Sequence, residues 1–126
     1  MPTNPIMQYQ EQAINTMSKG ELLIKLYDEV LKNINYASIL FKQKDYPMAE
    51  QYCDKSKSIF NYLSSILDRQ YPVSADLYKI YFFMNSEIIR AQVKRDHTIL
   101  DALLPLVEDM RATWAKAEKL CHMNKK

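Results

Sequence analysis

The segment Ala49–Leu67, AEQYCDKSKSIFNYLSSIL, decides the fold class of this chain. Its apolar and small residues recur at spacings of three and four, which places them on one face of a helix with about 3.6 residues per turn. Asp45 can cap this helix and Pro47 fits its first turn, so we predict a helix from Asp45 to about Asp68. The predicted core face consists of Ala49, Tyr52, Cys53, Ser56, Ile59, Phe60, Leu63, Ile66 and Leu67.

A helix is also predicted upstream of this segment. Ser18 and Glu21 match a capping box, in which a hydroxyl and a carboxylate each bond a free amide at a helix start. The apolar pattern that follows ends near Lys42. Its core face consists of Leu23, Leu26, Tyr27, Val30, Ile34, Ala37 and Phe41.

Two more helices are predicted downstream. The third runs from about Ala75 to Lys94, with Ser74 as its cap. The fourth runs from about Thr98 to His122, and Pro105 should kink it or separate its first turn. The core face of the third helix is expected to carry Leu77, Tyr78, Tyr81, Met84, Ile88 and Ala91. That of the fourth is expected to carry Ile99, Leu100, Leu103, Leu106, Val107, Met110, Trp114, Ala117 and Cys121.

These four helices predict an all-α fold, an antiparallel up-and-down four-helix bundle, because short connections force neighbouring helices to run in opposite directions. We divide the chain into an N-terminal arm over residues 1–17, a bundle over 18–122 and a C-terminal tail over 123–126. Tyr9 and Ile14 give the arm apolar side chains that could dock on the bundle.

Composition excludes several classes of function. The chain has 126 residues, one glycine, and 17 Lys and Arg against 15 Asp and Glu. Glycine-rich phosphate loops are therefore excluded, and no cluster of cations favours nucleic acid. Cys53 and Cys121 have no partner spacing, and the sequence shows neither a signal peptide nor an apolar run long enough for membrane insertion. We expect a cytoplasmic protein.

Catalytic and metal-binding patterns are not found in the sequence. A di-iron bundle needs Glu-x-x-His motifs, which this chain lacks. His97 lies at a helix junction, and the adjacent Cys121 and His122 would point about 100° apart on a helix. No Ser or Cys is framed by an oriented base. We therefore expect no enzyme activity, no cofactor and no metal.

The informative feature is a surplus of apolar residues. Besides its core face, the third helix has a second stripe formed by Ala75, Phe82, Ile89 and Val93. On the first helix, Ile24 and Leu31 also lie off the core line. Two explanations stay open: the core faces are wide, or these residues line grooves that receive an amphipathic or extended segment of a partner.

An ordered set of residues resembles the flagellar export chaperone FliS family over about Tyr9 to Ala117. In that family an N-terminal Tyr precedes a capped helix with a Leu-Tyr-Asp signature, here Leu26, Tyr27 and Asp28. This chain lacks the family's Gly pair between the second and third helices and carries Phe82 where the family has Asp. Other matching residues are Ala13, Thr16, Ser18, Glu21, Leu22, Ile59, Leu63, Leu67, Asp68, Ala75, Leu77, Tyr81, Met84, Ile88, Ala91, Asp96, Leu100, Arg111, Thr113 and Trp114.

The resemblance implies a cytoplasmic, non-enzymatic chaperone that binds the disordered C-terminal segment of flagellin, prevents premature polymerisation and assists delivery to the flagellar secretion apparatus. The alternative is a non-catalytic adaptor or scaffold that forms a homodimer or larger homo-oligomer through the third helix. The expected partner-binding residues are Tyr9, Ile14, Ile24, Leu31, Phe82, Ile89 and Val93.

Overall fold

The structure, a computed structural model, describes residues 19–123, so the predicted arm with Tyr9 and Ile14 lies outside the described residues. Within that range the chain forms four α-helices and no strand, which confirms the all-α prediction. The helices are α2 (Lys19–Lys42), α3 (Tyr46–Ser65), α4 (Val73–Lys94) and α5 (His97–Met123).

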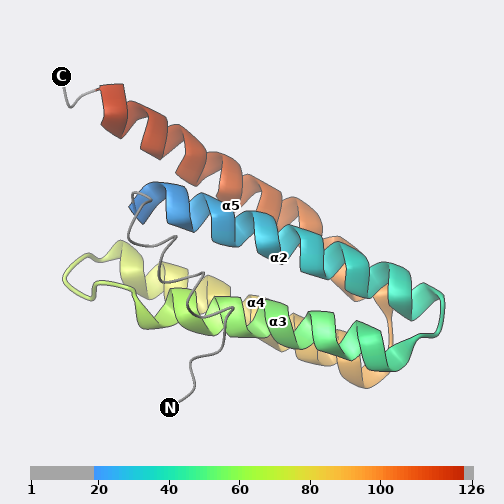
Figure 1. Ribbon diagram of the computed structural model, residues 1–126. Helices are drawn as coiled ribbons and strands as arrows, with labels where there is room; N and C mark the ends of the chain where they lie inside the picture. Colours follow the sequence, from blue (N-terminus) through green and yellow to red (C-terminus); the bar gives the residue numbers. More distant parts are fainter. Residues whose placement is uncertain (1–18, 124–126) are drawn as a thin grey trace, which may run out of the picture.

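The helices pack as a four-membered bundle. Successive helices run in opposite directions, as Figure 1 shows. Helix α2 packs against α3 and α5, and α4 packs against the same two helices from the other side. Helices α2 and α4 therefore occupy diagonal positions, and each has an outward face that the other helices do not cover.

The core contains most of the residues that periodicity predicted. Tyr27, Phe60, Ile88 and Val107, one from each helix, are 0% exposed. Cys53 is also buried, and burial raises the pKa of its thiol to about 12, so the thiol stays protonated and serves as a packing residue. The buried polar residues Asn33, Ser38 and Ser56 complete the interior; the Ser56 hydroxyl donates to the carbonyl of Tyr52 one turn earlier, which removes an unsatisfied donor.

At one end of the bundle, the α4–α5 turn contacts the start of α3. Lys44 in the α2–α3 turn and Arg95 in the α4–α5 turn have left-handed backbones, with φ of 62° and 51°. Arg95 places its guanidinium 4.1 Å from the ring centre of Tyr46, which is a cation–π contact. Asp96 accepts hydrogen bonds from the Thr98 amide and hydroxyl, and so caps the start of α5.

Several local predictions were wrong. Ser74 does not cap the third helix, because α4 begins at Val73 after Pro72, and Ser74 lies buried inside it. Helix α5 continues through Pro105, so of the two expected effects of this proline, a kink or a separate first turn, the separate turn does not form. Four residues expected in the core are exposed instead, because no neighbouring helix covers their edge of the stripe: Ile66 at 47%, Tyr78 at 51%, Leu106 at 43%, and Ala117.

Candidate partner-binding surface

Helix α4 presents an apolar stripe on its outward side. Phe82, Ile89 and Val93 are 64%, 48% and 78% exposed, whereas Tyr81 and Ile88, each one position away, are buried. A step of one residue turns a helix by about 100°, so the two sets lie on different faces. Tyr78, one turn before Phe82, extends the exposed stripe. The second stripe predicted from the sequence is therefore exposed. Tyr78, which was predicted on the core face, belongs to the exposed side as well.

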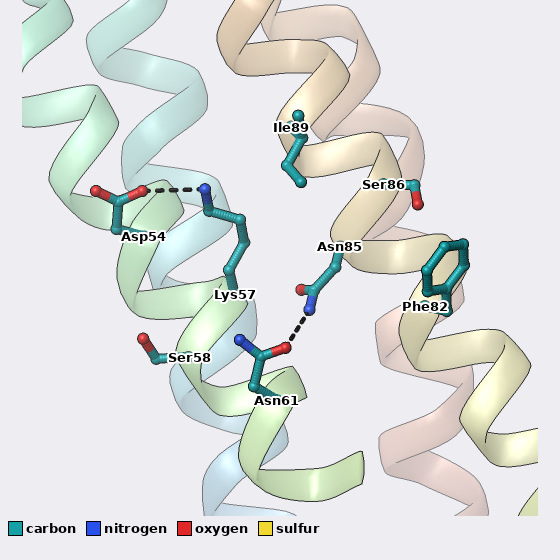
Figure 2. Close-up of a pocket in the computed structure, with 8 residues that line it drawn as sticks. All are labelled: Asp54, Lys57, Ser58, Asn61, Phe82, Asn85, Ser86 and Ile89. Atoms are coloured by element: carbon teal, nitrogen blue, oxygen red, sulfur yellow. Dashed lines mark hydrogen bonds and ion pairs between the residues drawn. The ribbon is translucent and has the colours of Figure 1, made fainter.

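A groove of about 620 Å³ runs between α3 and α4 beside this stripe (Figure 2). Its α4 wall combines the apolar side chains of Phe82 and Ile89 with two polar ones, and its α3 wall is polar throughout. The lining residues are Asp54, Lys57, Ser58 and Asn61 from α3, and Phe82, Asn85, Ser86 and Ile89 from α4. A helix with one apolar and one polar side would match these two walls.

Polar contacts hold the two walls of the groove together. The Asn85 amide donates from Nδ2 to Oδ1 of Asn61 at 2.8 Å, and the two amides face each other in Figure 2. Within the α3 wall, Lys57 forms an ion pair with Asp54 at 3.2 Å. The positive and negative charges of the groove lining therefore cancel. Gln92 donates to Asp54 at 3.1 Å, and this hydrogen bond lowers the pKa of the carboxyl.

One atom of the groove is unusual. The Oδ1 oxygen of Asn85 is buried and accepts no hydrogen bond from the part of the chain that the structure describes. A buried acceptor without a donor costs about 1–3 kcal/mol. Helical periodicity does not single out Asn85 or Asn61, because their spacing of 24 positions carries no local signal.

A second cavity, of about 210 Å³, lies at the end of the bundle where α2 begins. All four helices contribute to it, for example through Leu23, Leu63, Leu77 and Trp114. Its lining is mainly apolar, and the exposed Tyr71 stands at its edge. The cavity therefore offers a second apolar surface, at the end of α2 that adjoins the predicted arm.

Two residues that line this cavity, Tyr81 and Trp114, are hydrogen-bonded to Tyr27 in the core. The Trp114 indole N–H donates to the Tyr27 hydroxyl at 3.0 Å, and the hydroxyls of Tyr27 and Tyr81 lie 2.6 Å apart. Burial raises the pKa of Tyr27 far above its ordinary value, so this hydroxyl stays neutral. These hydrogen bonds join α5, α2 and α4. Trp114, expected to be largely buried, is half-buried at the edge of the core.

The structure separates the residues that were expected to bind a partner. Ile24 and Leu31 are half-buried on a face of α2 that they share with Asp28, whose carboxylate pairs with Arg111 of α5. That face is directed toward α5, whereas Phe82 belongs to α4, which lies diagonally opposite α2. The α2 pair and the α4 stripe therefore form two surfaces.

Two residues of the Leu-Tyr-Asp signature contact residues of α5 from the same resemblance. Tyr27 bonds Trp114, and Asp28 pairs with Arg111. These contacts join α2 to α5 across more than eighty positions of sequence. The signature therefore contributes to helix packing.

The described residues contain neither a cluster of metal ligands nor a membrane-spanning helix. Within residues 19–120, no three His, Cys, Asp or Glu side chains cluster so that they could hold a metal ion. His97 contacts Asp101 at 3.0 Å. No helix in the described range has the length and apolar character needed to cross a membrane.

Comparison with known proteins gives a consistent result. Residues 2–120 match the family described as flagellar protein FliS. The chain is also 30% identical over 114 residues to the flagellar secretion chaperone FliS of Bacillus subtilis (strain 168), and this alignment covers 90% of the chain and 86% of the relative. This chain, with its four helices and its signature contacts between α2 and α5, therefore belongs to the FliS family of flagellar secretion chaperones.

Proposed function

We propose that this protein binds the C-terminal segment of flagellin in the cytoplasm, keeps it from polymerising and helps to deliver it to the flagellar secretion apparatus. The observation that carries the proposal is the exposed apolar stripe of α4 beside the α3–α4 groove. A disordered amphipathic segment gains free energy when it folds onto such a surface, at the entropic cost of its ordering. This activity requires no catalysis and no cofactor.

The stripe of Phe82, Ile89 and Val93 is the proposed primary contact, because these side chains are the most accessible of the expected binding residues that the structure describes. Ile24 and Leu31 would form a second contact near α5, which requires a client that extends around the bundle. Tyr9 and Ile14 are proposed to cover apolar surface before the client arrives. The arm would then compete with flagellin for this surface.

The alternative function is a scaffold that associates with itself through α4. The same exposed stripe supports it, since apolar surface of this kind can be buried by a second copy of the chain. A stable dimer should then bury Phe82 and Ile89 and should leave no affinity for flagellin.

A titration distinguishes the two functions. A fluorescent peptide of the flagellin C-terminal segment is titrated with the protein, and sedimentation gives the mass of the free and the bound protein. We expect saturable binding to the monomer. A dimer that does not bind the peptide would refute the chaperone proposal and support the scaffold.

A further inference from the structure

The exposed stripe of α4 has the spacing of a helix-pairing seam with an amide at its centre. Tyr78, Phe82, Asn85 and Ile89 follow one another at intervals of four, three and four. Side chains at these intervals contact a single partner helix, as the a and d positions of a coiled coil do. Asn85 has apolar residues on both sides along this seam. It is therefore the position at which a hydrogen bond can distinguish one partner side chain from another.

The environment of Asn85 favours a neutral amide partner. Its Oδ1 lacks a donor among the described residues, and its Nδ2 bonds Asn61. Because Lys57 and Asp54 pair with each other, the lining has no excess charge that would recruit a cation or a carboxylate. An Asn or Gln side chain supplies both a donor and an acceptor.

We infer that Asn85 is a specificity-determining residue, which selects a client helix that brings one Asn or Gln against the Asn61–Asn85 pair and thereby sets its register on α4. The inference rests on the proposed function, because it takes the α3–α4 groove as the binding surface. The second N–H of the Asn85 amide and the second lone pair of the Asn61 Oδ1 are left for the client amide, so the Asn61–Asn85 hydrogen bond stays intact. A single polar residue in an apolar seam fixes register in the same way in coiled coils.

The test is a double-mutant cycle. Peptides of the flagellin C-terminal segment, each with one Asn or Gln changed to Leu, are titrated against the wild-type protein and against Asn85→Leu. We expect one peptide substitution to weaken binding to the wild type by about fivefold, which corresponds to one hydrogen bond of about 1 kcal/mol. The same substitution should change the affinity of Asn85→Leu by less than about twofold.

Two further variants keep the result interpretable. Gln43→Leu makes the same amide-to-leucine change at an exposed position of the α2–α3 turn, outside the groove, so it is the matched control and should keep the wild-type pattern. Asn85→Ala repeats the cycle without adding apolar surface. If no amide of the peptide couples to position 85 while Phe82→Ser weakens binding, the register inference is overturned and the proposed site stands. If the wild type does not bind the peptide, or Phe82→Ser has no effect, the proposed site and the inference both fall.

Discussion

Substitution of neighbouring residues on α4 separates binding from folding. Ile88 is 0% exposed and Ile89 is 48% exposed, so the same change to Asn at the two positions tests two different faces of one helix. The helix propensity lost is the same in both variants. The pair Ile88→Asn and Ile89→Asn is therefore a matched control, to which Phe82→Ser is added on the exposed face.

The structure sets the expected magnitudes. Phe82 is 64% exposed and Ile89 is 48% exposed, so together they expose about as much surface as one fully exposed apolar side chain. Complete burial of one such side chain by a client contributes about 1.5–3 kcal/mol to the binding free energy. The double variant Phe82→Ser and Ile89→Asn should therefore weaken binding of the flagellin peptide by about 10- to 150-fold. Ile88→Asn places an amide in the core and should cost about 3 kcal/mol or more.

The assay combines thermal unfolding by circular dichroism with the fluorescent peptide titration. Ile88→Asn should lower Tm by about 10 °C or more, and Ile89→Asn by less than about 5 °C. Equal losses of Tm would show that the stripe is part of the core. Intact melting and intact affinity in the double variant would show that the client binds elsewhere.

Three further predictions concern the end cavity and the arm. Trp114→Phe removes the indole N–H that donates to Tyr27 and should lower the free energy of urea unfolding by about 1 kcal/mol; an unchanged value would contradict a stabilising role for this bond. Burial raises the pKa of Tyr27 above its unfolded value of about 10, so its contribution to stability is present below pH ~10 and is lost as the pH rises further. Tyr27→Phe should flatten that decline in unfolding free energy, and a parallel pH profile would refute the assignment. Deletion of residues 1–12 should raise the binding of a dye for apolar surface and alter the affinity for the flagellin peptide, and the shielding role fails if both stay at wild-type values.

The sequence by itself determined the four helices and the centres of their core faces. Periodicity is a local property, because residues three and four apart share a face wherever the helix is placed. This is why the first helix, predicted from the capping box to Lys42, is found at Lys19–Lys42. Phe60 and Ile88, at the centres of their stripes, are fully buried.

The tertiary structure alone decided how far burial extends around each helix. Tyr78 and Leu106 lie at the edges of their stripes and are about half exposed. Whether an edge is covered depends on the crossing angle and on the side chains of the neighbouring helix, which one-dimensional periodicity does not contain. The same reason separates Ile24 from Phe82, since the sequence does not state that α2 and α4 occupy diagonal positions.

The polar pairs between helices were also decided by the tertiary structure. Asn61 meets Asn85, and Ser38 donates to Asp101, through contacts that no local spacing predicts. Such pairs form because packing of the helices brings short polar side chains from distant parts of the sequence within hydrogen-bond distance. The sequence thus determined which face of each helix is apolar. The packing of the helices decided which polar side chains of different helices meet.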